Sequence, residues 1–227
     1  TEIDSKVYDH IWTESGLKLL EKDYRLSAVP EDISEGIMAI TKEFVPYVSP
    51  QPNVNHFLQE GEKIQFGKGK YEVIATPGHS EGLIVLYNEH DRVLLSTDHI
   101  LPKITPNISY WFYGERNPLQ SYENSLQKIK QLDAEYVIPS HGKPFYGANE
   151  RIDEIWAHHL ERFDMTLEAI KDGAPVFAVC EALFSFELTT YDYQFAVGEA
   201  IAHLEYLRAK GECERTEHAG KWIYQRV

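Results

Sequence analysis

The chain has 227 residues, of which 43% are hydrophobic and 26% are charged, a composition typical of a globular protein with one or two domains. Its formal net charge of −14 repels nucleic acids and anionic membranes over most of the surface. No apolar run approaches the roughly 20 residues that a membrane-spanning helix requires, and no signal peptide is visible. We therefore expect a cytoplasmic protein without membrane contacts, for which a nucleic acid is a poor partner.

The first 53 residues contain two segments with helical spacing, at 12–25 and 31–45. In the second segment, apolar residues recur at intervals of three and four positions, at Ile33, Ile37, Ile40 and Phe44. This spacing places them on one face of a helix. Three prolines between residues 46 and 52 then predict a loop.

Between residues 54 and 98 the hydrophobic pattern changes to that of strands. The predicted strands, separated by polar or glycine-containing turns, are 54–58, 63–66, 71–75, 82–87 and 92–95. The continuous apolar run at 83–86 indicates a strand that is covered on both faces.

An aromatic-rich connection at 101–116 leads to a predicted helix that begins at Asn117-Pro118 and to a strand at 136–139. Proline suits the first position of a helix. The order strand, helix, strand predicts helices packed on a sheet, so the expected fold class is α/β.

Beyond residue 147 the pattern becomes mainly helical, with predicted helices at 149–172, 175–184 and 193–210 and a terminal hairpin at 212–225. The two cysteines, Cys180 and Cys213, have neither the spacing of a metal site nor that of a disulfide framework. We expect both to be reduced and buried.

Three predicted strands end in short polar turns that carry residues of the type that binds metals. The segments are Thr76-Pro77-Gly78-His79-Ser80, Ser96-Thr97-Asp98-His99 and Pro139-Ser140-His141-Gly142. A strand end holds a side chain rigidly, and the turn that follows leaves it open to a substrate. Imidazole and carboxylate groups are ligands that zinc and similar divalent metals accept.

These segments, in this order, resemble the later ligand motifs of the metallo-beta-lactamase-fold hydrolases. The resemblance covers roughly residues 54–145. It implies that His79 is a terminal ligand of one zinc ion, that Asp98 bridges two zinc ions and that His141 is a terminal ligand of the second. It also implies an αββα sandwich, with Asp98 as the catalytic residue.

The first motif of that family, His-x-His-x-Asp-His, has no counterpart in the sequence. Tyr8-Asp9-His10 contains an Asp-His pair, but the two preceding histidines are absent. We therefore interpret the chain as an N-terminally incomplete form of the fold. We expect it to bind zinc weakly or not at all and to self-associate as a homodimer through uncovered strand edges.

The helices and hairpin of the C-terminal part resemble a winged-helix module, which several subfamilies of the same fold carry. We therefore expect two domains: a partial hydrolase domain at 1–147 and a winged-helix-like domain at 148–227.

The aromatic run after Asp98 has two interpretations. Tyr110, Trp111 and Tyr113 either pack between the two domains or form a pocket wall over the metal centre. We favour the second interpretation and predict that these three residues bind the substrate. His99 is interpreted as a structural histidine behind the ligands rather than as a ligand.

The resemblance implies a hydrolase in which a metal-bound hydroxide attacks a small ester, thioester or lactone, with activity impaired in this chain. A ribonuclease of the same fold is the alternative within the class, and the net charge of −14 counts against it. A degenerate binding protein without catalytic activity is the alternative from another class, because the chain offers each metal ion only two ligands.

Overall fold

The computed structural model describes residues 1–184 and 187–227, and these residues form two compact units. The first unit comprises residues 1–5, 54–108 and 118–160, and the second comprises residues 6–53, 109–117 and 161–227. Neither unit is continuous along the chain. The expected division into domains 1–147 and 148–227 therefore stays a prediction.

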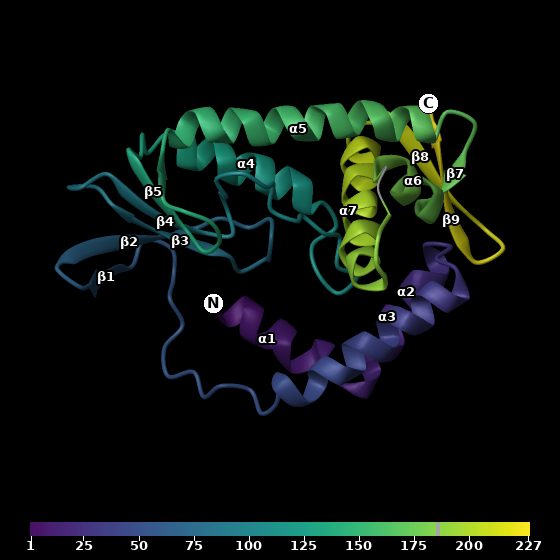
Figure 1. Ribbon diagram of the computed structural model, residues 1–227, viewed down its shortest axis with the longest axis horizontal. Helices are drawn as coiled ribbons and strands as arrows, with labels where there is room; N and C mark the ends of the chain where they lie inside the picture. The colour runs from purple at the N-terminus through teal and green to yellow at the C-terminus, as the bar shows by residue number, and fades with distance from the viewer. Residues whose placement is uncertain (185–186) are drawn as a thin grey trace. The chain divides into compact units, whose positions relative to one another are not determined.

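The first unit contains a six-stranded sheet in which the strands follow their order in the chain (Figure 1). The strands are β1 (Lys63–Phe66), β2 (Gly69–Ala75), β3 (Ile84–Asn88), β4 (Val93–Thr97), β5 (Tyr136–Pro139) and β6 (Phe145–Tyr146). All neighbouring strands are antiparallel except β4 and β5, which are parallel. As a consequence, β2, β4 and β5 run in the same direction and end at the same edge of the sheet.

Helix α4 (Pro118–Lys130) and the first part of α5 (Ala148–Ala169) lie beside the sheet. The core of the first unit lies between these helices and the sheet. The four central strands each contribute a fully buried residue, at Val73, Val85, Leu94 and Val137. Helix α4 buries side chains at intervals of three and four residues, at Leu119, Tyr122, Leu126 and Ile129. Burial of each aliphatic side chain in this set contributes about 1.5–3 kcal/mol, so helix and sheet stabilise each other.

The second unit is mainly helical. Its elements are the last part of α1 (Glu2–Ile11), α2 (Glu14–Leu26), α3 (Glu31–Phe44), the short η1 (Val45–Tyr47), the end of α5, α6 (Val176–Leu183), α7 (Thr190–Ala209), β7 (Ala174–Pro175), β8 (Cys213–His218) and β9 (Lys221–Arg226). The three strands form an antiparallel sheet in the order β7-β9-β8. Thr13 caps α2 by accepting a hydrogen bond from the Gly16 amide, and a capping box between Thr189 and Asp192 starts α7.

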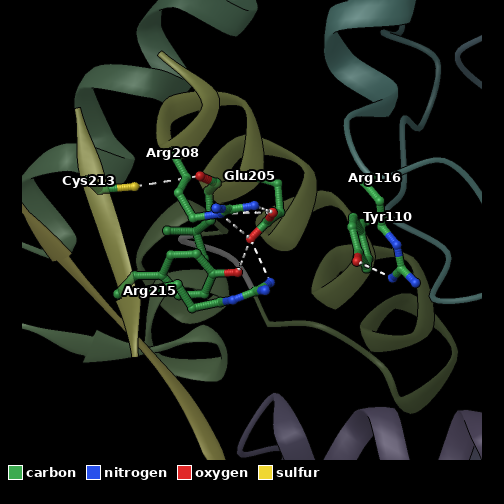
Figure 2. Close-up of polar contacts among 8 residues, drawn as sticks. Tyr110, Arg116, Glu205, Arg208, Cys213 and Arg215 are labelled. Carbon is green, nitrogen blue, oxygen red and sulfur yellow. Dashed lines mark hydrogen bonds and ion pairs between the residues drawn. The ribbon is translucent and has the colours of Figure 1, made fainter. Parts of the chain in front are cut away.

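Helix α7 carries a carboxylate that is buried in the second unit and fully paired (Figure 2). The side chain of Glu205 is 2% exposed. It accepts hydrogen bonds from Arg208 Nη2 at 2.7 Å, Arg215 Nη1 at 2.9 Å and the Tyr224 hydroxyl at 2.6 Å. These contacts connect α7 to both β8 and β9. The cluster therefore fixes the terminal hairpin against the helix.

The predicted α/β fold class is confirmed by this mixture of helices and sheets, and so are most of the predicted elements. The predicted strand at 54–58 is wrong, because these residues form no strand and are largely exposed, and an exposed segment gains little from pairing with a sheet. The sequence analysis also missed α1. Cys180 and Cys213 are free and buried, as expected.

Two expectations about the whole assembly are not decided by these elements. The likeness of the C-terminal part to a winged helix stays a prediction, and so does self-association as a homodimer.

Within the residues that the structure describes, no helix is both long enough and apolar enough to cross a membrane.

Candidate metal centre

The three predicted metal ligands follow three strands of the first unit that end at one edge of its sheet. His79 lies four residues beyond β2, Asp98 directly follows β4, and His141 lies two residues beyond β5. The parallel pairing of β4 and β5 aligns Thr97 with Pro139. Asp98 and the segment 140–141 are therefore neighbours in space, although more than 40 residues separate them in sequence.

His79 is held in one tautomer by the backbone. Its Nδ1 atom lies 2.9 Å from the carbonyl oxygen of Asn107, so Nδ1–H donates and Nε2 keeps its lone pair. Metal-binding histidines usually donate a hydrogen bond from the N–H of their second ring nitrogen in this way. The turn before His79 requires glycine, because a Cβ atom at Gly78 would lie only 2.6 Å from the ring of Tyr122.

Asp98 and His141 come together at the ends of β4 and β5. His141 Nε2 lies 3.4 Å from Asp98 Oδ1, and the same oxygen accepts a hydrogen bond of 2.6 Å from the Ser140 hydroxyl. The side chains of Asp98 and His141 are 27% and 71% exposed, respectively. Both groups are therefore accessible from solvent, as a metal site that admits a substrate requires.

The backbone before Asp98 adopts a conformation that is unusual for its residue type. Thr97 has a φ of 48°, in the left-handed region that β-branched residues rarely adopt. Two hydrogen bonds hold it there: Thr97 Oγ1 donates to the Ile84 carbonyl at 3.0 Å, and the Ser140 amide donates to the Thr97 carbonyl at 3.2 Å. Strain of this kind concentrates at functional sites.

The histidine next to Asp98 belongs to the core of the first unit. His99 is completely buried, and its ring meets the ring of Tyr122 edge to face at 5.4 Å. Burial lowers the pKa of His99 to about 3, so the imidazole is neutral. This position agrees with the interpretation of His99 as a structural residue.

The donor set fits a divalent metal in chemistry but not in arrangement. His79, Asp98 and His141 supply two imidazoles and one carboxylate, and His79 is held in the tautomer that a ligand needs. Protein zinc sites have at least three protein ligands. Among residues 1–184 and 187–227, no group of three or more His, Cys, Asp or Glu side chains is arranged to hold a metal ion.

The predicted substrate-binding residues belong to the second unit, whereas the predicted metal ligands belong to the first. Tyr110 is 2% exposed, and its hydroxyl accepts a hydrogen bond of 2.6 Å from Arg116 (Figure 2). The rings of Trp111 and Tyr113 stack with their centroids 6.1 Å apart, and both line a cavity of the second unit. Their part in substrate binding stays a prediction.

Two residues that support the site were missed by the sequence analysis. Ser140 orients the Asp98 carboxylate, and its position directly before His141 was a usable signal. The Asn107 carbonyl that orients His79 lies 28 residues further along the chain, and no sequence pattern indicated it.

Two family models match the chain. Residues 6–141 match the model described as "Metallo-beta-lactamase superfamily", and residues 163–227 match the model described as "Metallo-beta-lactamase-like, C-terminal domain". The first match includes all three predicted metal ligands.

Curated proteins that are similar to parts of the chain include the following two. "Probable metallo-hydrolase YqjP" from Bacillus subtilis is 29% identical over 161 residues, which are 67% of this chain and 49% of that protein. "Beta-lactamase-like protein 2 homolog" from Caenorhabditis elegans is 30% identical over 117 residues, which are 52% of this chain and 37% of that protein. The chain thus spans about half the length, or less, of these two curated relatives.

Two solved structures are similar over 90% of the chain. A beta-lactamase domain protein from Burkholderia ambifaria is 30% identical, with a TM-score of 0.82, and 60% of its length is covered. The metallo-beta-lactamase family protein TTHA1429 from Thermus thermophilus is 28% identical, with a TM-score of 0.71, and 68% of its length is covered. The chain belongs to the metallo-beta-lactamase superfamily, because the model of that family matches more than half of its residues.

Proposed function

We propose that this protein is a zinc-dependent hydrolase of small esters, thioesters or lactones. The observation that carries the proposal is the convergence of three strand ends at one sheet edge, where Asp98 and His141 lie 3.4 Å apart. Membership of the metallo-beta-lactamase superfamily supports it, and so does the similarity to a protein named as a probable metallo-hydrolase.

The residues that would hold zinc are His79, Asp98 and His141. When bound, zinc polarises a substrate carbonyl and lowers the pKa of a water molecule to about 7. Ser140 and the Asn107 carbonyl are positioning residues for these groups. The Ser140 hydroxyl holds one oxygen of Asp98, which leaves the second oxygen available, and the Asn107 carbonyl keeps the Nδ1 proton on His79.

A binding protein without catalytic activity is the second candidate. It is favoured by one observation, that the described residues contain no group of three metal donors. A ribonuclease is less well supported, because a net charge of −14 opposes the approach of a polyanion.

Zinc binding to the 227-residue chain tests the assignment of the ligands independently of catalysis. We expect weak binding that is lost on mild chelation, because two-ligand sites hold metal poorly. Asp98→Ala and His141→Ala should abolish it, and Ser140→Ala should weaken it by about 10-fold or more. His90→Ala is the matched control, because its side chain is 93% exposed and lies in the turn between β3 and β4. Equal zinc binding by all four variants would remove these residues from the site.

The reaction class is tested with the product of the complete coding sequence, assayed with zinc on an ester, a thioester, a lactone and a single-stranded RNA. We expect turnover of at least one of the first three and no cleavage of RNA. Asp98→Ala should abolish the turnover without unfolding the protein. A zinc-loaded protein that turns over none of the four substrates would support the binding protein instead.

A further inference from the structure

The second unit contains a cavity whose walls are mostly aromatic. The cavity has a volume of about 330 Å3, within the range of roughly 300–1,000 Å3 typical of small-molecule sites. It is formed by residues at the end of α1 and from α2, α3, the connection at 111–113 and α7. Seven of its thirteen lining residues are aromatic. We call it the aromatic cavity and define it by Trp12, Asp23, Phe44, Trp111, Tyr113 and Tyr191.

Of the described residues that line the aromatic cavity, Asp23 alone is charged. This residue is 4% exposed, and its carboxyl group has no hydrogen-bond partner among the residues that the structure describes. Burial raises the pKa of Asp23 to about 7, although the positive charges of Lys22 and Arg116 act in the opposite direction. Burying a carboxylate without a close partner costs free energy. A cation placed beside the carboxylate would remove that cost and would therefore bind favourably.

A second polar group of the aromatic cavity is also unpartnered. The Nε1 atom of Trp12 is buried and has no hydrogen-bond partner among the described residues. Buried indole N–H groups normally find an acceptor. The cavity thus presents one negative charge and aromatic faces, and one unpartnered donor is buried in its wall. Aromatic faces attract ammonium groups through their quadrupoles.

We propose that the aromatic cavity binds a small organic amine that has an apolar body and carries a hydrogen-bond acceptor. The ammonium group pairs with the Asp23 carboxylate, the apolar body lies between the aromatic walls, and the ligand's acceptor receives a hydrogen bond from the Trp12 indole N–H. An anionic ligand is excluded, because it would be buried next to a carboxylate. This binding does not depend on hydrolysis at the candidate metal centre, since all the residues involved belong to the second unit.

Three probes with the same body and different end groups test the proposal: 2-phenoxyethylamine, 2-phenoxyethanol and phenoxyacetate. Binding to the wild-type chain is measured by calorimetry at pH 8, where Asp23 is ionised. We expect the amine to bind at least about 10-fold more tightly than the alcohol, and phenoxyacetate not to bind. In NMR spectra, the indole N–H resonances of Trp12 and Trp111 should shift on addition of the amine, whereas that of Trp156 should not.

Two variants with the same change of charge locate the binding site. Asp23→Asn should bring the affinities of the amine and the alcohol within about twofold of each other. Glu21→Gln, on the exposed side of the same helix, should leave the preference for the amine unchanged. Trp111→Leu should weaken both probes, because it removes an aromatic wall.

Equal binding of the three probes to the wild-type chain would overturn the proposal, whether or not the variants fold. An amine preference that survives Asp23→Asn would also overturn it, and so would a shift confined to Trp156.

Discussion

Two regions of the second unit each bury a carboxylate. One carboxylate is surrounded by hydrogen-bond and ion-pair partners, and the other has none within hydrogen-bond distance among the described residues. Glu205, on α7, is 2% exposed and is contacted by two arginines and a tyrosine hydroxyl. Asp23, on α2, is 4% exposed, and only the more distant charges of Lys22 and Arg116 act on it. The fold tolerates a buried charge whose partners are in place and loses stability when a partner is removed, whereas an uncompensated buried charge weakens the fold and remains available to a ligand.

The largest effect is expected from removal of the compensated carboxylate. Glu205→Ala should lower the free energy of unfolding by about 3–5 kcal/mol, because it leaves the buried Tyr224 hydroxyl and the half-buried Arg215 without their partner. Urea unfolding followed by circular dichroism measures this change.

Glu214→Ala is the control for Glu205→Ala, because Glu214 is an exposed residue of β8, where substitutions usually change stability by less than about 0.5 kcal/mol. If both variants unfolded at the same urea concentration, the Glu205 cluster would not be what holds the hairpin.

A smaller effect of opposite sign is expected at Asp23. Desolvation raises its pKa from 3.8 to about 7, so the folded state resists ionisation more than the unfolded state does. The resulting cost is absent below about pH 4, grows as the pH rises and is complete above pH 7. Asp23→Asn should therefore increase the free energy of unfolding by roughly 1–3 kcal/mol at pH 8 and change it little at pH 4.

The difference between Asp23→Asn and wild type at the two pH values isolates this group, because every other titrating residue is common to both chains. Burial raises the pKa of the neighbouring Tyr24, so its hydroxyl stays neutral at both pH values. A variant as stable as wild type at both pH values would mean that Asp23 is compensated after all, and the contrast with Glu205 would disappear.

The smallest effect on stability is expected at a third carboxylate, Asp98 of the first unit. Its side chain is 27% exposed, so Asp98→Asn should change the free energy of unfolding by less than about 1 kcal/mol. Zinc binding should nevertheless be lost, because the amide cannot replace the charged ligand. Thermal unfolding and a zinc titration on the same sample separate the two effects. A large loss of stability would place Asp98 with Glu205 as a structural carboxylate.

The strand ends that carry the candidate metal ligands could be predicted because their signals are local. The segments 71–75, 92–95 and 136–139 show their apolar residues and turns within a few positions, and the structure has strands at Gly69–Ala75, Val93–Thr97 and Tyr136–Pro139. The segment 54–58 shows a similar apolar pattern but forms no strand, because a strand also needs a partner, and pairing is a tertiary property.

The sequence by itself determined the α/β class and the three segments that resemble the superfamily, because both depend on short-range patterns of apolar and polar residues. Only the tertiary structure decided what each acidic residue does. Lys22-Asp23-Tyr24 and Leu204-Glu205-Tyr206 give no hint of their different surroundings. The partners of Glu205 include Arg215 and Tyr224, which are 10 and 19 residues away. The cavity beside Asp23 is likewise assembled from the end of α1, α2, α3, the connection at 111–113 and α7. Tertiary packing brings these distant segments together, and the residues next to Asp23 in sequence do not indicate it.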